Sequence, residues 1–398
     1  MKNRMVISST FIEYADRLLD SMARHSIESP AEFNELALAL FALQFQHVPP
    51  YRRFCEARKK TPETITKWSE IPAIPTAAFK EFELSSLPAG ERTSVFHSSG
   101  TTRERPSRHY HNRRSLDLYG ASLLPWFQAH VLPELSGCPD SSSMPHRTFF
   151  ILTPNAARSP HSSLAHMFET VSSAFGSTDS MFVGTLDRDE SWILDMDRTL
   201  PALRECAQEG RPIVLLGTAF SFVHLLDYLR ERKLHYQLAT GSRLVETGGY
   251  KGRSRTLPKP ELHSGITELL GIPSTHIICE YGMSELSSQA YDRIVGTSES
   301  QISDRVFHFP PWARARIVSP ETRNEVADGE VGLIHAFDLA NASSVMAIQT
   351  EDLGIRRGNG FELIGRAALA EPRGCSLMNT TETIARIGSR RTGVLMDV

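Results

Sequence analysis

Cysteine is scarce in this sequence and shows none of the spacings typical of a structural role. The five cysteines are Cys55, Cys138, Cys206, Cys279 and Cys375. They are scattered, odd in number and never form a C-x-x-C pair, which argues against a disulfide framework and against a zinc knuckle. A reducing cytoplasm is the compartment that fits this pattern best.

Long apolar runs are also missing. The N-terminus carries basic residues but lacks the apolar core of a secretory signal. The longest apolar run, residues 212–226, is interrupted by Ser221 and His224 and is too short to span a bilayer. We therefore expect a soluble, cytoplasmic protein without a membrane span.

An excess of charge of one sign is absent as well. The chain has 43 basic and 46 acidic residues, which gives a formal net charge of −3. No overall field favours nucleic acid or anionic lipid, so we expect no nucleic-acid partner, and any anion site must be local. With 40% hydrophobic residues over 398 positions, the chain can bury a sizeable core in one large or two medium domains.

The pattern of apolar residues predicts an α/β fold. Residues 1–90 have a helical pattern, whereas residues 91–292 alternate short apolar runs with helical stretches, as in a largely parallel sheet. The expected strands lie at 94–97, 148–152, 212–216 and 276–279, and the expected helices at 114–130, 163–175 and 219–233.

The helical pattern stops at about residue 292. Residues 293–365 are predicted to form a β-rich subdomain, with strands at 306–309, 313–318, 331–337, 345–349 and 361–364. Residues 1–365 would then make one large domain, composed of the helical part, the α/β core and this subdomain. Residues 366–398 would be a short tail, since they are too few for a domain of their own.

The commonest nucleotide loops, G-x-x-x-x-G-K-[ST] and G-x-G-x-x-G, do not occur. Instead, a run of small hydroxyl residues around a glycine follows the strand expected at 94–97. Such a loop offers hydroxyls and backbone amides to an anion, and the glycine permits close approach. A Ser/Thr-rich surface turn is the alternative. The run consists of Ser98, Ser99, Gly100, Thr101 and Thr102.

This run resembles the phosphate loop of adenylate-forming enzymes, and three further segments follow in the order of that superfamily. EYGMSE at 280–285 resembles the Y-G-x-[ST]-E motif and comes directly after an apolar strand. TEDLG at 350–354 resembles T-G-D-L-G. GR at 365–366, followed by RG at 373–374, resembles the hinge before a small C-terminal lobe.

The resemblance implies a role for each of these residues. Tyr281 would pack on adenine and Ser284 would meet the α-phosphate. Glu285 would hold Mg²⁺, a hard cation that prefers oxygen ligands, and Asp352 would accept from the ribose hydroxyls. Besides residues 98–102, the implied ATP-binding residues are Tyr281, Gly282, Asp352 and Arg366.

Within the superfamily, the chain is most similar to the acyl-protein synthetases of bacterial bioluminescence operons (LuxE type), relatives of the phenylacetate-CoA ligases. The segments that carry this likeness, besides YGMSEL, are FK at 79–80, PSR at 106–108, TGGYK at 247–251, SQAYD at 288–292 and RGCS at 373–376. The resemblance implies that a fatty acid is activated as acyl-AMP and passed to a cysteine near the C-terminus. Cys375 matches that position.

Two features depart from the superfamily pattern. Arg103 stands where a glycine is usual, and no lysine occurs after Lys259, so the C-terminal lysine that many members use during adenylation is missing. The short tail after Arg366 fits the acyl-protein synthetases and counts against an ordinary CoA ligase. The candidate cations for the leaving pyrophosphate are Lys251, Arg103, Arg105, Arg108, Arg386, Arg390 and Arg391.

Four residues have plain alternatives to a functional role. Cys375 could be a small buried residue, although Arg373 beside it would favour the reactive thiolate. His109 and His111 lack a third metal ligand at a useful spacing, so we expect two solvated histidines beside the loop. His224 falls on the polar side of its helix and should be exposed.

The sequence thus predicts an ATP- and Mg²⁺-dependent acid–thiol ligase. It would form acyl-AMP from a carboxylic acid, which the resemblance implies is a fatty acid, and transfer the acyl group to a protein cysteine. The catalytic residues would be Cys375, Ser284, Glu285 and Lys251. Free coenzyme A or a carrier protein as acceptor is one alternative, and a non-catalytic nucleotide-binding relative is another. The expected protein partner is an acyl-CoA reductase or an acyl carrier protein.

Overall fold

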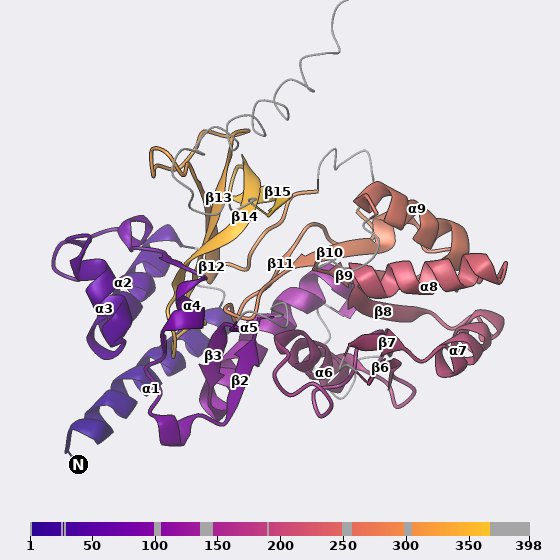
Figure 1. The fold of residues 1–398 in the computed structure, drawn as a ribbon, viewed down its shortest axis with the longest axis horizontal. Helices are drawn as coiled ribbons and strands as arrows, with labels where there is room; N and C mark the ends of the chain where they lie inside the picture. Colours follow the sequence, from indigo (N-terminus) through magenta and orange to yellow (C-terminus); the bar gives the residue numbers. More distant parts are fainter. Residues whose placement is uncertain are drawn as a thin grey trace, which may run out of the picture.

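Two β-sheets, one mostly parallel and one mostly antiparallel, organise the chain (Figure 1). The computed structural model describes residues 2–24, 27, 29–98, 105–135, 146–188, 191–248, 257–297 and 305–366. Within these residues no helix is long and apolar enough to cross a bilayer. The predicted α/β fold class is confirmed.

The six-stranded sheet has the order β11-β10-β9-β8-β4-β5. All neighbouring strands are parallel except β10 and β11, which confirms the largely parallel sheet predicted for this part of the chain. Its strands are β4 Thr148–Ile151, β5 Met181–Phe182, β8 Ile213–Thr218, β9 Arg243–Thr247, β10 Ile277–Tyr281 and β11 Ala290–Tyr291.

Helices cover both faces of this sheet. Leu215 and Leu244 pack with side chains of α7, α8 and α9, whereas Val214 and Val245 pack with side chains of α5 and α6. Successive residues of a strand point to opposite faces of the sheet. Because both faces are covered, these strands are apolar at nearly every position. The helices are α5 Arg113–Val131, α6 Ser163–Phe175, α7 Met196–Glu209, α8 Ala219–Glu231 and α9 Lys259–Leu270.

Polar residues fix where several of these helices begin. The side chains of Asn112, Ser162 and Thr218 accept hydrogen bonds from backbone N–H groups in the first turns of α5, α6 and α8. These N–H groups have no partner inside the helix, which is why such caps stabilise it. Thr218 also ends β8, so the cap sets a sharp turn at the carboxyl end of the sheet.

The strand predicted at 94–97 is present. It does not join the parallel sheet, although the sequence pattern had placed it there. β2 Ser94–His97 pairs with β3 Arg108–His111 as a separate antiparallel hairpin. The run at 98–102 therefore lies in the connection between two hairpin strands. Residues 99–104 lie outside the described residues.

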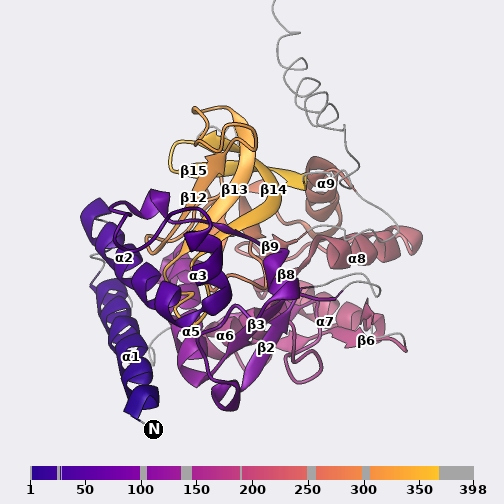
Figure 2. The ribbon, with the colours of Figure 1, turned by 60° about the vertical axis from the view of Figure 1, so that its left-hand side comes forward.

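The second sheet has the order β1-β14-β13-β12, with β15 pairing with β14. In Figures 1 and 2 it lies above the six-stranded sheet. Phe361 of β15 and Phe307, which forms a bridge to Phe361, pack against Tyr281 of β10. β1 comes from the N-terminal part of the chain and pairs in parallel with β14. Its strands are β1 Ile74–Pro75, β12 Ala313–Val318, β13 Val331–Asp338, β14 Ala347–Arg357 and β15 Gly360–Arg366.

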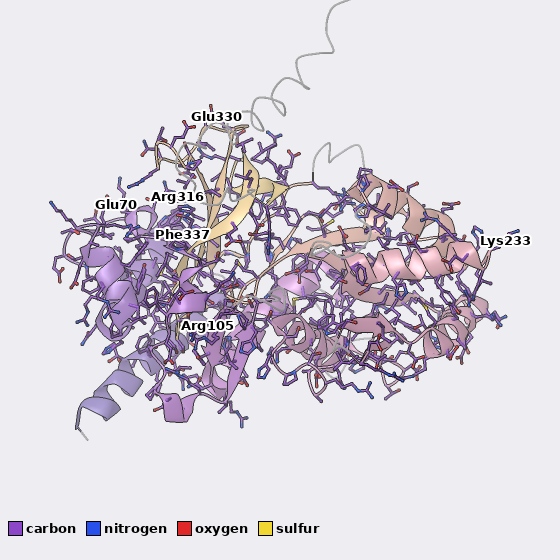
Figure 3. All side chains as sticks on the ribbon, in the orientation of Figure 1. Glu70, Arg105, Lys233, Arg316, Glu330 and Phe337 are labelled. Carbon is purple, nitrogen blue, oxygen red and sulfur yellow. The ribbon has the colours of Figure 1, made fainter. Side chains whose placement is uncertain are left out.

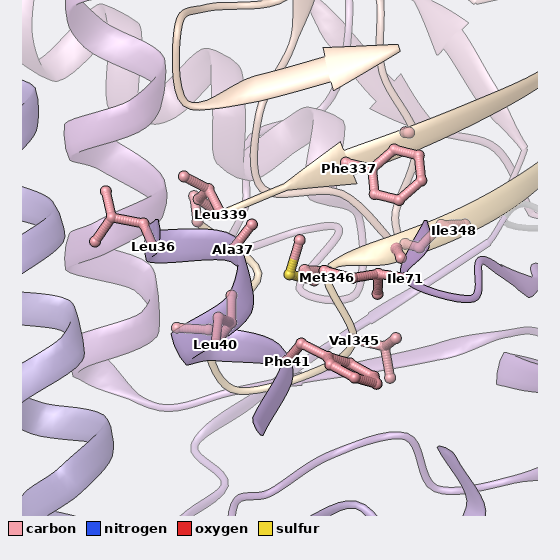
Figure 4. Close-up of a cluster of buried hydrophobic side chains, with 14 of the residues drawn as sticks. Leu36, Ala37, Leu40, Phe41, Ile71, Phe337, Leu339, Val345, Met346 and Ile348 are labelled. Carbon is pink, nitrogen blue, oxygen red and sulfur yellow. The ribbon is translucent and has the colours of Figure 1, made fainter. Parts of the chain in front are cut away.

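The N-terminal helices confirm the helical pattern of this part of the chain. Leu36, Leu40 and Phe41 of α2 are buried against the end of β13 and the start of β14, where Figure 4 shows them beside Leu339 and Met346. The helices of this part are α1 Lys2–Ala23, α2 Pro30–His47, α3 Pro49–Glu56 and α4 Ala78–Glu81.

Several elements were not predicted from the sequence. These are α7, α9, β1, β3, β5, β9, β11 and a small hairpin of β6 Gly184–Leu186 with β7 Trp192–Leu194. The expected strand at 306–309 is reduced to isolated bridges at Phe307 and His308. The domain boundaries at residues 91, 293 and 366 stay a prediction.

Candidate active site

The structure brings the YGMSE and TEDLG segments together at the carboxyl end of β10. Tyr281 is the last residue of β10, and its hydroxyl donates a hydrogen bond to Asp352 Oδ2 of β14 at 2.9 Å. Arg366 Nε at the end of β15 lies 3.9 Å from Asp352 Oδ1. Three predicted nucleotide-binding residues from two sheets thus meet at one point. Crevices at the carboxyl ends of parallel strands are the usual ligand sites of such sheets.

Aromatic rings surround Tyr281. The ring centroids of Phe307, Phe309 and Phe361 lie 6.1, 6.2 and 5.2 Å from that of Tyr281, all in edge-on arrangements. A planar apolar lining of this kind suits a flat base. Sequence reasoning did not single out these three phenylalanines, because each one reads as an ordinary strand residue.

Ser284 and Glu285 lie in the connection between β10 and β11, and both are buried. The Ser284 hydroxyl donates a hydrogen bond to Glu285 Oε2 at 3.0 Å. Burial raises the pKa of the Glu285 carboxyl, and the hydroxyls of Ser107 and Ser284 oppose this rise. The Ser284 hydroxyl thus donates to the Glu285 side chain in a desolvated position.

The two ends of the predicted phosphate loop lie beside this pair. The backbone N–H of Ser107 donates to the Ser98 hydroxyl at 3.0 Å, which joins the end of β2 to the start of β3. Since Ser107 also faces Glu285, the loop begins and ends next to the Y-G-x-[ST]-E segment. The remaining predicted loop residues, together with Lys251 and Cys375, lie outside the described residues, and so do Arg103, Arg386, Arg390 and Arg391.

His109 and His111 are not solvated, contrary to the sequence prediction. Both are almost fully buried, at 2% and 1% exposure, because they share the inward face of β3. His109 Nδ1 lies 2.9 Å from the carbonyl oxygen of Ser284, so Nδ1 carries the proton and donates it. Burial lowers the pKa of His109 to about 4. His109 is therefore a neutral side chain that supports the Ser284 backbone. The alternation of residues in RHYH was the sequence signal that could have predicted the burial of both histidines.

His224 is exposed, as predicted. Arg105 and Arg108, which were candidate cations, flank the loop and are at least partly accessible. Figure 3 labels Arg105 near the middle of the molecule, between the N-terminal helices and the six-stranded sheet.

Glu280 is a buried carboxyl that sequence reasoning missed. Its side chain accepts a hydrogen bond from the Thr247 hydroxyl of β9. Burial raises the pKa of Glu280 to about 7, against the effects of that hydrogen bond and of the Lys259 charge. A Cβ at position 282 would collide with this carboxyl group, which explains the glycine that follows Tyr281. A charged residue inside the apolar run IICEY was the available signal.

One further cluster, on α9 and the strands β9 and β10, has the composition of a metal site. Glu246, His263 and Cys279 are buried with their ligand atoms within 4.8 Å of one another. However, Lys259 Nζ lies 3.2 Å from Glu246 Oε1, and Arg305 Nη1 lies 3.3 Å from Cys279 Sγ. Two fixed cations already contact the atoms that would bind a metal, so we assign no ion to this cluster.

Comparisons with known proteins agree with the motifs. The model of the family "Acyl-protein synthetase, LuxE" matches residues 1–383. The long-chain-fatty-acid–luciferin-component ligase of Aliivibrio fischeri is 23% identical over 372 residues, which are 88% of this chain and 89% of that protein. The ligase of the same name from Vibrio harveyi is 23% identical over 360 residues, 86% of each chain.

The fold has counterparts among solved structures. A 2-hydroxyisobutyryl-CoA ligase, in complex with 2-HIB-AMP and CoA in the thioesterification state, superposes with a TM-score of 0.61 at 15% identity, over 85% of this chain and 69% of that one. Its open conformation gives a TM-score of 0.60, over 84% and 70%. Since the family match extends over almost the whole sequence, this chain is a ligase that belongs to the acyl-protein synthetase family, LuxE.

Proposed function

We propose that this ligase uses ATP to activate a carboxylic acid, of the fatty class, as acyl-AMP and then transfers the acyl group to a protein cysteine. The observation that carries the proposal is the meeting of Tyr281, Asp352, Ser284 and Glu285 beside the two ends of the loop at Ser98. The names of the A. fischeri and V. harveyi relatives support a fatty acid as substrate.

In the proposed first step, a carboxylate oxygen of the acid attacks the α-phosphorus of ATP. The bond between this phosphorus and the bridging oxygen breaks, and pyrophosphate leaves with the electron pair. The chain contributes mainly by orientation and by electrostatic stabilisation. Tyr281 and the neighbouring phenylalanines would hold adenine, Asp352 would accept from ribose, and Ser284 would donate to the α-phosphate.

The residues present also fit a Mg²⁺ ion. Glu285 offers a hard carboxylate oxygen in a desolvated position, and hydroxyl groups and its own backbone N–H offset only part of the pKa rise that burial causes. We propose that Glu285 holds the ion. Bound there, Mg²⁺ would neutralise charge on the phosphate groups.

In the proposed second step, a cysteine thiolate attacks the acyl carbonyl carbon. The bond to AMP breaks, AMP leaves with the electron pair, and the thiol proton has already passed to water. The three cysteines described by the structure are poor nucleophiles because they are buried: burial raises the pKa of Cys55 to about 12 and also raises the pKa values of Cys206 and Cys279. Their burial supports Cys375 as the cysteine that accepts the acyl group. Cys138 is the remaining cysteine and serves as the control.

The test is a panel of carboxylic acids incubated with the protein, ATP and Mg²⁺. We expect acid-dependent pyrophosphate release and an acyl mass on the intact protein that hydroxylamine removes. Cys375→Ala should lose the acyl mass while it still releases pyrophosphate, and Cys138→Ala should keep both.

Other outcomes point to the alternatives. Activity that requires added coenzyme A, with no acyl mass on the protein, would mean a CoA ligase. ATP binding without pyrophosphate release for any acid would contradict the adenylation step and favour a non-catalytic relative.

A further inference from the structure

The residues proposed to contact the phosphates lie on a loop that has almost no secondary structure of its own. Residues 282–289 connect β10 to β11, and Ser284 and Glu285 are in their middle. Side chains on such a segment keep a fixed direction only if other parts of the protein hold the backbone. Which groups hold residues 282–289 is therefore a question about the site itself.

Asp338, the last residue of β13, holds this loop by its backbone. Its Oδ2 accepts hydrogen bonds from the N–H groups of Ser287 and Ser288, both at 2.8 Å. Its Oδ1 accepts from the Ser288 hydroxyl at 2.7 Å and from the N–H of Ala340 at 3.0 Å. Burying a carboxylate completely is costly, because it loses its contacts with water. The four hydrogen bonds to Asp338 offset that cost, and two of them come from consecutive loop amides.

Asn341, three residues further on, holds the same loop next to Glu285. Its side-chain N–H group donates to the carbonyl oxygen of Glu285 at 2.8 Å, and its Oδ1 accepts from the Ser287 hydroxyl at 2.7 Å. Asn341 thus fixes the peptide group that immediately follows the Glu285 side chain.

The turn that carries Asp338 and Asn341 is itself well anchored. Figure 3 shows Glu330 at the outer end of the five-stranded sheet and Phe337 at its inner end, beside the N-terminal helices. Gln44 of α2 donates to the carbonyl oxygen of Asn341 at 2.8 Å and accepts from the N–H of Met346 at 3.0 Å. Leu339 and Met346 pack on α2 in the cluster of Figure 4.

The opposite side of the loop is held as well. The Ser288 hydroxyl lies 2.8 Å from the Ser122 hydroxyl of α5, which accepts from Trp312 Nε1 at 2.7 Å. His109 donates to the carbonyl oxygen of Ser284. The loop is therefore clamped between the hairpin and α5 on one side and the turn after β13 on the other.

We propose that Asp338 and Asn341 are positioning residues of the ligase site, which fix the backbone of residues 285–288 and so set the direction of Ser284 and Glu285. Both residues are fully buried, and the role proposed for them requires no contact with the substrates. This inference rests on the function proposed above only for its kinetic consequence, because the loop geometry can be measured without substrates.

The first test is hydrogen exchange of the protein without ligand, followed by mass spectrometry of peptides that cover residues 282–291. In Asp338→Asn one carboxylate oxygen becomes an N–H donor that faces other donors, so the amides of Ser287 and Ser288 should exchange about tenfold faster. Peptides from β8 should exchange as in the unaltered protein. Unchanged exchange over 282–291 would overturn the inference.

The second test compares two buried serines. Ser287 lies in the loop and contacts the turn after β13, whereas Ser344 lies at the end of that turn. Ser287→Ala removes a 2.7 Å hydrogen bond to Asn341, whereas Ser344→Ala removes a 2.7 Å hydrogen bond to the carbonyl oxygen of Leu84, away from the loop. Both serines are at most 1% exposed, so the packing changes are alike.

With the acid found in the panel, we expect Ser287→Ala to lower kcat for pyrophosphate release several-fold, and Asp338→Asn to lower it by about ten- to a hundredfold, because small displacements of positioned groups are costly. KM for ATP should change less than kcat, since Tyr281 and Asp352 are not displaced. Ser344→Ala should stay within about twofold of the unaltered protein.

Equal kcat values for Ser287→Ala and Ser344→Ala would overturn the kinetic part of the inference. If Asp338→Asn does not fold, the serine pair still decides the question. If the unaltered protein releases no pyrophosphate with any acid, the proposed function fails, while the exchange of residues 282–291 in Ser287→Ala against Ser344→Ala still decides whether the turn holds the loop.

Discussion

At the scale of single residues, Asp352 is central to the proposed nucleotide site. Its carboxylate accepts from the Tyr281 hydroxyl at 2.9 Å and faces Arg366. Burial raises the pKa of Asp352, and the Tyr281 hydrogen bond and the Arg366 charge lower it. These two groups offset the effect of burial only in part, so the pKa of Asp352 stays above its ordinary value.

We predict that Asp352→Asn raises KM for ATP by about tenfold, because hydrogen bonds to a charged acceptor contribute about 1.5–3 kcal/mol. The measurement is pyrophosphate release as a function of ATP concentration. Glu362→Gln is a suitable control, since Glu362 pairs with Arg357 on the same sheet and has no contact with Tyr281. Equal KM values for both variants would contradict the role of Asp352.

A second prediction concerns Glu280, whose pKa burial raises to about 7. In the unfolded chain the carboxyl group has its ordinary pKa of 4.5, so the folded state binds the proton more tightly. Stability therefore falls as the pH rises from about 4.5 to 7, by roughly 3 kcal/mol at most, and stays at the lower level above pH 7.

Glu280→Gln mimics the protonated form and should remove this pH dependence. Urea unfolding at pH 5 and pH 8 measures it: the variant should lose less stability between the two pH values than the unaltered protein does. An identical loss in both proteins would show that Glu280 does not titrate in this range.

His109 illustrates why single residues near the site were only partly predictable. The motifs predicted Tyr281, Ser284, Glu285 and Asp352 because these residues occur in recognisable local patterns. His109 contacts Ser284, which is far away in the sequence, so its burial depends on tertiary contacts. The same holds for Asp338, whose partners are about 50 positions away.

At the scale of elements, the β2–β3 hairpin and helix α5 form one unit, and the predicted phosphate loop connects the two strands of this hairpin. β3 ends at His111, and Asn112 then caps α5 by accepting from the N–H of Ser115 at 3.0 Å. The Ser115 hydroxyl in turn accepts from the N–H of Asn112 at 2.9 Å. The cap therefore sets the angle between the hairpin and the helix.

We predict that Asn112→Ala destabilises the protein by about 1 kcal/mol, since it leaves an N–H group of the first helical turn without its partner. Ser29→Ala is the matched control: Ser29 precedes α2 but its side chain makes no capping hydrogen bond. Its change should stay within about 0.5 kcal/mol in urea unfolding. Equal losses would mean that the Asn112 cap contributes nothing.

At the scale of the whole molecule, the site lies where the two sheets meet. Tyr281 belongs to the six-stranded sheet and Asp352 to the five-stranded sheet. A nucleotide that contacts both residues would connect the two sheets and stabilise the folded state by mass action.

We predict that a non-hydrolysable ATP analogue at 100 times its Kd stabilises the protein by about 2.7 kcal/mol. At the same concentration, the stabilisation of Asp352→Asn should be smaller by about 1.3 kcal/mol, because a tenfold weaker Kd lowers the ratio of ligand concentration to Kd about tenfold. Thermal unfolding with and without the analogue measures both. An equal shift in the two proteins would place the nucleotide away from Asp352.

The sequence by itself determined the fold class, the parallel sheet with its covering helices, and the segments that meet at the site, because apolar periodicity and short motifs are local properties of the chain. The tertiary structure decided that β2 pairs with β3 rather than with the parallel sheet, that His109 and His111 are buried, and that Asp338 and Asn341 hold the loop of Glu285. The contacts of His109, Asp338 and Asn341 depend on which distant residue satisfies a buried polar group. Such pairings follow from packing in three dimensions and leave no periodic trace in the sequence.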